Sequence, residues 1–217
     1  NLTYSEISGN KVVTGARGIY LAAYNSHNTV TSNKISNLTP SNYEGIRLDS
    51  PVANPSHHNI ISNNDLSEFV TAEISVLGNA NQISVRGNAY ENYIIGNSIG
   101  SAALAGILCL GYKMVIAGNT FVGKGRYAIK FENSSPNSPY NNVVVGNNST
   151  GYTASVAQVY ISNLSHDNYF GADNRNGIAA NSFGQLTGTG AAGIFDCGFN
   201  NNFVPVSYTH LTLPTNR

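Results

Sequence analysis

The octad N-T-V-T-S-N-K-I at residues 28–35 returns along the chain with its two asparagines in place. Further copies read N-I-I-S-N-N-D-L (59–66), N-Y-I-I-G-N-S-I (92–99) and N-V-V-V-G-N-N-S (142–149), and weaker ones lie at 5–12 and 114–121. The octads begin roughly 22 to 33 residues apart, and a period in that range predicts a stacked repeat architecture.

A second short motif of alternating character follows each octad. It reads G-I-Y-L (18–21), G-I-R-L (45–48), E-I-S-V (73–76), G-I-L-C (106–109), A-I-K-F (128–131) and Q-V-Y-I (158–161). Such alternation is typical of a strand with one buried face. Because no helical pattern intervenes, each repeat of roughly 25 residues predicts one turn of a solenoid built only from strands.

Stacked turns predict inner rows of like residues, which would bury apolar area at about 25 cal/mol per Å². The rows are Ile19, Ile46, Ile74, Ile107, Ile129 and Val159; Leu21, Leu48, Val76, Cys109, Phe131 and Ile161; and Val30, Ile61, Ile94, Ile116 and Val144. The octad's second asparagine supplies a further column: Asn10, Asn33, Asn64, Asn97, Asn119 and Asn147. We expect these asparagines to take the left-handed backbone conformation and to form a hydrogen-bonded ladder.

The composition agrees with a single strand-built domain. Apolar residues make up 41% of the chain, whereas charged residues make up only 10%, far below the usual quarter. The net charge is zero and Lys and Arg are scattered along the chain. The sequence therefore predicts no basic patch that would bind nucleic acid or an anionic membrane. No apolar run is long enough to span a bilayer, so no membrane insertion is expected.

Both ends of the sequence have unusual features. The chain begins at Asn1, already inside a repeat, as an internal fragment would. Its last twelve residues, V-S-Y-T-H-L-T-L-P-T-N-R (206–217), resemble the translated sequencing-adapter tail found in proteins assembled from environmental DNA. We therefore expect a repeat domain over 1–205 that lacks both natural ends, and a non-native tail over 206–217.

By its motifs the chain resembles the right-handed parallel β-helix superfamily, with repeats most like pectate-lyase-type and NosD-type repeat domains. The resemblance covers roughly residues 5–200. It implies an all-β fold, a right-handed single-stranded parallel β-helix of about seven coils. Members include polysaccharide lyases, glycoside hydrolases, phage tailspikes and non-catalytic surface proteins. The resemblance also implies an extracellular, cell-surface or periplasmic location.

The segments after the second motif predict a cleft. They are long after coils 2, 3 and 5 (49–58, 77–91 and 132–141) and short after coil 4 (110–113). Insertions at one corner of a solenoid project from one face, often the binding face. We therefore expect tall walls around a low place at coil 4.

A polysaccharide is the expected ligand of this cleft. A uronic-acid lyase needs a cation and a base at one sugar carbon, and a hydrolase needs two carboxylates roughly 5–9.5 Å apart. The catalytic candidates form two couples, Arg47 with Asp49 and Lys130 with Glu132. Neighbouring strands lie about 4.8 Å apart, so roughly 14 Å separates the couples and they cannot act together. The substrate-binding candidates are Tyr20, His57, His58, Leu108, Tyr112, Tyr140 and Tyr160.

Three functions fit these features. The first is a secreted or surface module that binds a polysaccharide and, if an enzyme, cleaves it as a lyase or glycoside hydrolase. The second is a non-catalytic structural or adhesive solenoid, whose association into trimers the sequence leaves open. The third is a NosD-like periplasmic accessory of metal insertion, favoured if His57, His58 and His166 converge.

The sequence predicts no metal site or cofactor. Adjacent residues such as His57 and His58 point apart in an extended chain. The repeated aspartate pattern of calcium-binding solenoids does not occur, so calcium is unsupported.

Overall fold

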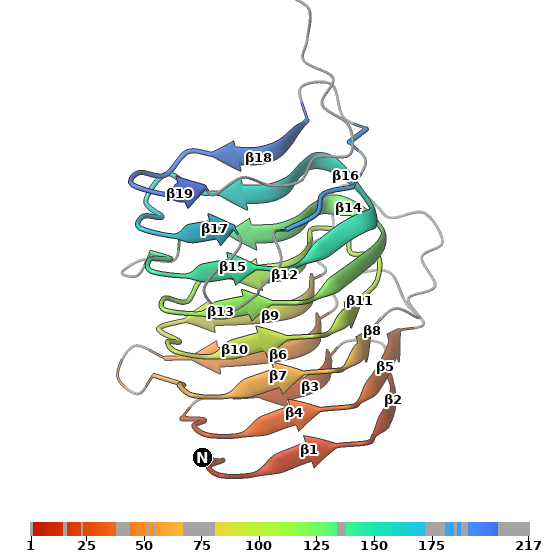
Figure 1. Ribbon diagram of the computed structural model, residues 1–217. Helices are drawn as coiled ribbons and strands as arrows, with labels where there is room; N and C mark the ends of the chain where they lie inside the picture. Colours follow the sequence, from red (N-terminus) through yellow and green to blue (C-terminus); the bar gives the residue numbers. More distant parts are fainter. Residues whose placement is uncertain are drawn as a thin grey trace, which may run out of the picture.

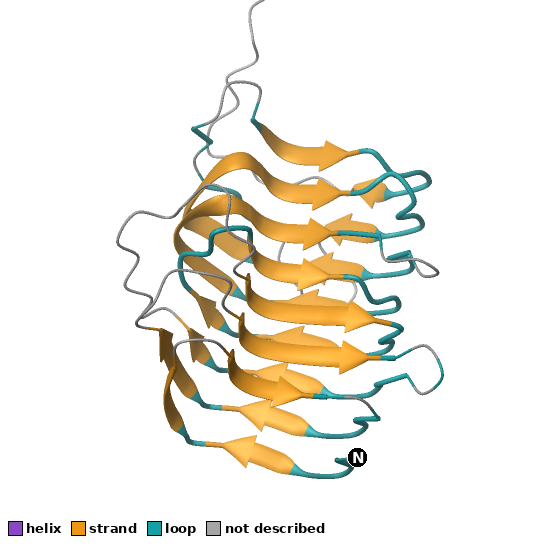
Figure 2. Cartoon of the chain, turned by 180° about the vertical axis from the view of Figure 1, so that it is seen from behind, coloured by secondary structure: helices purple, strands orange, loops and turns teal. Residues whose placement is uncertain are grey.

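The computed structural model describes residues 2–14, 17–22, 24–37, 44–51, 53, 55–66, 81–133, 138–171, 181–184, 186–187 and 191–203. The regular structure in these residues is strand (Figure 2). The strands wind upward from the N-terminus as a right-handed parallel β-helix (Figure 1), and every strand pair is parallel, for example β4 with β7 and β6 with β9. Among the described residues, no helix has the length and apolar character needed to cross a membrane.

Each coil contributes to three faces. The first face is an eight-stranded sheet: β1 (Glu6–Ser8), β4 (Thr29–Thr31), β7 (Ile60–Ser62), β10 (Tyr93–Ile95), β13 (Val115–Ala117), β15 (Val143–Val145), β17 (Tyr169–Gly171) and β19 (Asn202–Phe203). The second face contains β2 (Lys11–Thr14), β5 (Lys34–Asn37), β8 (Asp65–Leu66) and β11 (Ser98–Ile99). The third contains β3 (Arg17–Leu21), β6 (Glu44–Ser50), β9 (Asn81–Gly87), β12 (Ala105–Cys109) and β18 (Ala192–Asp196). The long strands β14 (Thr120–Phe131) and β16 (Asn148–Ile161) bend from the second face into the third (Figure 1).

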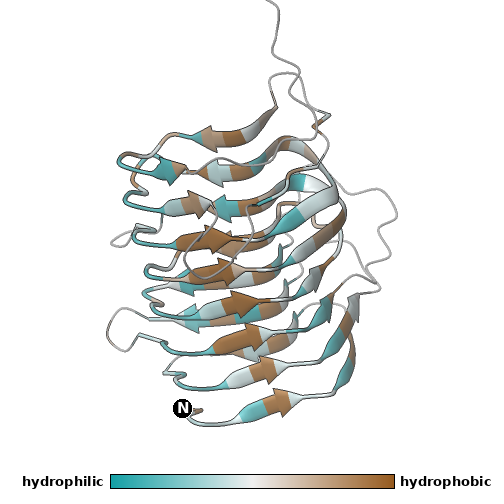
Figure 3. Cartoon of the chain, in the orientation of Figure 1, coloured by the Kyte–Doolittle hydropathy of each residue, from teal (hydrophilic) through white to brown (hydrophobic). Residues whose placement is uncertain are grey.

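Apolar residues recur at the same place in successive strands and fill the interior (Figure 3). The first-face row is confirmed, because Val30 pairs with Ile61 and Ile61 with Ile94, and all three are fully buried. The third-face rows are confirmed outside coil 3. Stacking therefore buries a continuous apolar column that no single coil could bury alone.

The inner-row places predicted for Ile74 and Val76 in coil 3 are occupied by other residues. Ile83 of β9 pairs with Ile46 below and Ile107 above, and so occupies the place predicted for Ile74. Val85 likewise takes the place predicted for Val76; both predicted residues lie outside the described part of the chain. The error has a simple cause: E-I-S-V (73–76) and Q-I-S-V (82–85) alternate identically, so the pattern could not choose between them.

The predicted asparagine ladder is confirmed, and it continues to Asn181. Each Nδ2 donates to the Oδ1 of the asparagine one coil above at 2.9–3.0 Å. Each backbone N–H donates to that same oxygen, as Asn64 does to Asn97 at 3.0 Å. Both polar groups of the buried side chain are thereby satisfied.

The octad's first asparagine forms a second ladder that the sequence analysis did not predict. Its members are Asn28, Asn59, Asn92, Asn142, Asn168 and Asn201. Where two members lie in adjacent coils, their side chains form hydrogen bonds of 2.8–3.0 Å. Met114 interrupts this ladder: its sulfur lies 3.8 Å from Asn92 Nδ2, while its backbone N–H still donates to Asn142 Oδ1.

The left-handed conformation was assigned to the wrong residues. It occurs one position before each ladder asparagine, as at Ser32 (φ 56°) and His58 (φ 54°). The members before the first ladder position are Tyr4, His27, His58, Glu91, Lys113, Asn141, Asp167 and Asn200. Their side chains are exposed or half-buried, so they form an outward column at the corner that leads into the first face. We call this set the outer column.

Candidate functional site

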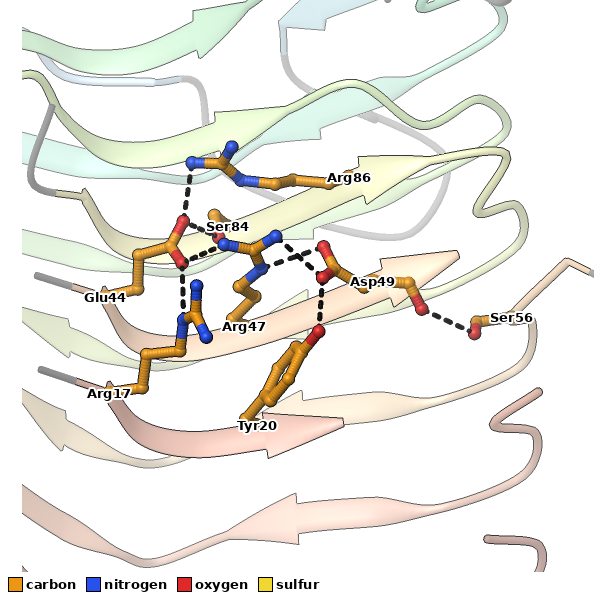
Figure 4. Close-up of polar contacts among 8 residues, drawn as sticks. All are labelled: Arg17, Tyr20, Glu44, Arg47, Asp49, Ser56, Ser84 and Arg86. Atoms are coloured by element: carbon orange, nitrogen blue, oxygen red, sulfur yellow. Dashed lines mark hydrogen bonds and ion pairs between the residues drawn. The ribbon is translucent and has the colours of Figure 1, made fainter. Parts of the chain in front are cut away.

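The predicted couple Arg47 and Asp49 belongs to a charged cluster on the outside of β3, β6 and β9 (Figure 4). Arg47 makes two contacts with the Asp49 carboxylate, from Nε at 2.8 Å and from Nη2 at 2.7 Å. The Tyr20 hydroxyl donates to the same carboxylate at 2.6 Å. Three residues predicted to face a ligand therefore direct their polar groups at one another.

A buried carboxylate lies at the centre of this cluster. The side chain of Glu44 is only 6% exposed, and it receives hydrogen bonds from Arg47 Nη1 at 2.8 Å, Arg86 Nη2 at 2.6 Å and Ser84 Oγ at 2.8 Å. Arg17 Nε lies 3.5 Å from the same carboxylate. Glu44 was not predicted as a site residue, because a glutamate at a strand start gives no sign that three arginines surround it.

The electrostatics of the cluster keep its groups charged. Burial opposes the charge of Arg47, but its hydrogen bonds to Asp49 and Glu44 outweigh burial and raise its pKa. Burial would likewise raise the pKa of Asp49, yet the bonds from Arg47 and Tyr20 lower it below its ordinary value. A proton-abstracting base needs a pKa near the working pH. The catalytic roles of Arg47 and Asp49 stay predictions, and this geometry is that of a structural ion-pair network.

Replacing Glu44 with glutamine is expected to lower the free energy of unfolding by about 2–3 kcal/mol near pH 7, since guanidinium groups lose their buried partner. Burial alone would raise the Glu44 pKa, but the bonds from Arg47 and Ser84 and the charge of Arg86 lower it below the ordinary 4.5. Its stabilisation is therefore present above that ordinary value and lost as the pH falls through the lower folded value. Urea unfolding at pH 7 and at about pH 3 should show the difference shrinking in acid. A difference that stays constant would contradict the assignment.

The second predicted couple is also internally paired. Lys130 Nζ lies 2.6 Å from Glu132 Oε1, and the lysine side chain is only 12% exposed. It lies over the rings of Tyr127 and Tyr160, with 5.6 Å and 5.8 Å from Nζ to their centroids. The predicted sugar-binding ring of Tyr160 stacks on Phe195 at 5.7 Å.

Leu108, a predicted substrate-binding residue, is buried. It is 3% exposed and packs in a small apolar cluster with Leu104, Ala105, Tyr127 and Ala157 on the outside of the third face. An outward side chain that is already covered offers little surface to a ligand.

The predicted three-walled cleft is wrong. The segments after coils 2 and 5 connect β6 to β7 and β14 to β15, from the third face to the first. In coil 3, however, residues 81–87 of the predicted wall segment (77–91) form strand β9 of the third face. The wall predicted at coil 3 is therefore a strand over these residues, and residues 77–80 lie outside the described part of the chain.

Rings stack along the corner that leads into the first face. Tyr112 and Tyr140 lie face to face with 4.7 Å between centroids, Tyr90 stacks on Tyr112 at 5.5 Å, and His166 stacks on Tyr140 at 5.3 Å. The two predicted sugar-binding rings, Tyr112 and Tyr140, thus present faces to each other. At the lower end His57 stacks on Tyr90 at 5.0 Å.

Three histidines converge at that lower end. His27 opens coil 2, whereas His57 and His58 open coil 3, and one ring nitrogen from each lies within 4.8 Å of the other two. The Nδ1 atoms of His57 and His58 are 2.8 Å apart, and His27 stacks on His58 with 5.0 Å between centroids. Burial lowers the pKa of His57, and the charges of His58 and His27 lower it further, which favours the neutral, ligating imidazole.

The expectation that His57 and His58 point apart is wrong. His58 has the left-handed conformation (φ 54°), so the chain turns between the two residues instead of running extended, and the two Nδ1 atoms meet at 2.8 Å. The convergence of His166 with this pair, which was the condition for favouring the third function, does not occur: His166 stacks between Tyr140 and Phe199, whereas His27 joins the pair. A signal for His27 existed, because His27 and His58 each directly precede the octad's first asparagine.

A family model described as "Periplasmic copper-binding protein (NosD)" matches residues 1–190. The chain belongs to the NosD family. No curated protein matches it. Among solved structures, a match is HetL, a pentapeptide repeat protein involved in heterocyst differentiation regulation from the cyanobacterium Nostoc sp. strain PCC 7120. It is 12% identical, with 96% of this chain and 88% of that chain covered and a TM-score of 0.21.

Two of the three histidines in this NosD family chain have the spacing of two ligands on one copper ion. Two nitrogens bound to one ion at about 2.0 Å lie about 2.8–3.3 Å apart for right-angled to tetrahedral arrangements, and the His57–His58 pair already has that separation. Imidazole is a ligand that copper accepts. Of the three sulfur-bearing residues, Cys109 and Met114 are fully buried and Cys197 is exposed, and none of them belongs to the cluster.

Proposed function

We propose that this protein is a periplasmic or extracellular copper-binding β-helix in which His27, His57 and His58 hold the ion. The observation that carries the proposal is the convergence of three imidazole nitrogens from two coils within 4.8 Å. The description of the family, a periplasmic copper-binding protein, supports both the metal and the location.

The donor set favours copper in its cupric state. Soft sulfur ligands select the cuprous ion, whereas imidazoles suit Cu²⁺, which also binds nitrogen sites more tightly than Ni²⁺ or Zn²⁺ does. His27 is exposed and His57 and His58 are half-buried, so the ion would be reached directly from solvent. This accessibility suits a protein that takes up copper and passes it on.

Copper titration of the whole chain tests the proposal. The chain has 13 tyrosines and no tryptophan, so its intrinsic fluorescence comes from tyrosine, and Tyr90 stacks directly on His57. We expect quenching that saturates at one Cu²⁺ per chain, and electron paramagnetic resonance should show hyperfine coupling to nitrogen. Quenching that never saturates, or a copper signal coupled only to oxygen ligands, would contradict the proposal.

The predicted polysaccharide module stays a prediction that the same chain can test. Its charged candidates are paired within their own coils, as Arg47 is with Asp49 and Lys130 with Glu132. Its candidate rings Tyr112 and Tyr140 cover each other. These contacts favour the copper-binding function, and a panel of uronic-acid polysaccharides assayed for unsaturated product would decide the other.

A further inference from the structure

We propose that Glu91 is a positioning residue of the copper site, which holds the His58 ring so that its Nδ1 faces the ion. This inference rests on the proposed function, because it assigns a role toward the ion held by His27, His57 and His58. It goes further by adding a residue of the next coil that contacts a ligand but not the ion.

The contacts of Glu91 support this role. Glu91 follows His58 in the outer column, one coil above, and its Oε2 lies 3.3 Å from His58 Nε2. Its other oxygen, Oε1, lies 3.4 Å from Lys113 Nζ, one coil further. The carboxylate is therefore fixed between a cation above and the histidine ring below, and it is two-thirds covered.

The two nitrogens of His58 then have different roles. A carboxylate oxygen only accepts, so the charge contact of Glu91 Oε2 with His58 Nε2 at 3.3 Å favours a proton on Nε2. That leaves the Nδ1 lone pair free, and Nδ1 is the atom that lies 2.8 Å from His57 Nδ1. A His57 Nδ1–H that donates to this lone pair would pre-form the spacing of two neighbouring ligands. Metal-ligating histidines commonly donate their other N–H to a carboxylate in this way, and loss of such a partner weakens metal binding about 10–100-fold.

The outer column offers a matched control. Asp167 has the same place in its coil, the same left-handed backbone (φ 53° against 51° for Glu91) and a carboxylate 2.8 Å from a histidine, His166 Nδ1. Alanine at either position therefore carries the same backbone strain and loses the same kind of contact. Only Glu91 touches a proposed ligand.

The experiment compares Glu91→Ala, Glu91→Gln and Asp167→Ala in the full chain. We expect Glu91→Ala to weaken Cu²⁺ affinity about 10–100-fold, and Asp167→Ala to leave it unchanged. Glu91→Gln should retain most of the affinity, because the glutamine carbonyl can still accept from Nε2–H. Nitrogen NMR of the metal-free proteins should show the neutral His58 ring with its proton on Nε2 in wild type and Glu91→Gln, and a mixture of the Nε2–H and Nδ1–H tautomers in Glu91→Ala.

Two results would overturn the inference without touching the proposed function. One is wild-type copper affinity in Glu91→Ala, and the other is a metal-free wild type that carries the His58 proton on Nδ1. Equal losses in Glu91→Ala and Asp167→Ala would also overturn it, since the effect would then come from the backbone. A wild-type chain that binds no copper would instead refute the proposed function and, with it, this inference.

Discussion

Replacing Asn97 with alanine is expected to lower the free energy of unfolding by about 3–5 kcal/mol, a large part of the 5–15 kcal/mol typical of a whole domain. Asn97 is buried at the middle of the predicted ladder. Its Oδ1 accepts from the backbone N–H and the Nδ2 of Asn64 at 3.0 Å each, and its Nδ2 donates to Ile61 O and Asn119 Oδ1 at 2.9 Å.

The loss of stability in Asn97→Ala comes from the hydrogen-bond partners of Asn97 that stay buried without a replacement. Without Asn97 the buried N–H of Asn64 and the carbonyl of Ile61 lose hydrogen bonds in a place that water cannot reach, and each such loss costs about 1–3 kcal/mol. Stability in a solenoid depends on interfaces between neighbouring coils, so weakening the coil 3 to coil 4 interface weakens the whole stack.

Urea unfolding with a constant slope measures the effect. Asn63→Gly is the matched control: Asn63 belongs to the corresponding turn one coil below, is exposed and has φ 53°, which glycine adopts readily. The control should unfold within about 0.5 kcal/mol of wild type. Similar losses in both variants would show that turn conformation, and not the ladder, supplies the stability.

The fold was predictable because its two main forces repeat in the sequence. Apolar residues at the same position of each repeat give the inner rows. Asn33, Asn64 and Asn97 recur at the turn between the first-face and second-face strands of each coil. The first-position ladder was missed although its asparagines open the octads. Ser5 and Met114 replace asparagine in two copies, which made the position look tolerant of change.

The candidate site was less predictable, because it depends on backbone conformation rather than on spacing. His57 and His58 looked divergent until the left-handed turn at His58 placed both rings together. The charged candidates could be chosen from the sequence, yet the pattern could not show that Arg47 bonds to both Asp49 and Glu44. Charged side chains that pair with one another and charged side chains that bind a ligand give the same pattern in the sequence.

Replacing His57 with alanine is expected to weaken Cu²⁺ affinity by more than about 100-fold, beyond the range found for residues that act through a ligand. His57 supplies one of three converging nitrogens and lies 2.8 Å from a second, so its loss removes a ligand and the contact that fixes the His58 ring. Competition against a chelator of known copper affinity gives the size of the loss.

His166→Ala is the control that makes this result specific. His166 has the same place in its coil as His57, stacks on a tyrosine in the same way (5.3 Å against 5.0 Å), and bonds to the neighbouring residue through Nδ1. It lies four coils above, about 19 Å away, so its removal should change copper affinity by no more than about twofold. A comparable loss in both variants would mean that copper binds scattered surface histidines. A large loss in His57→Ala alone would mean that the two coils together make one site.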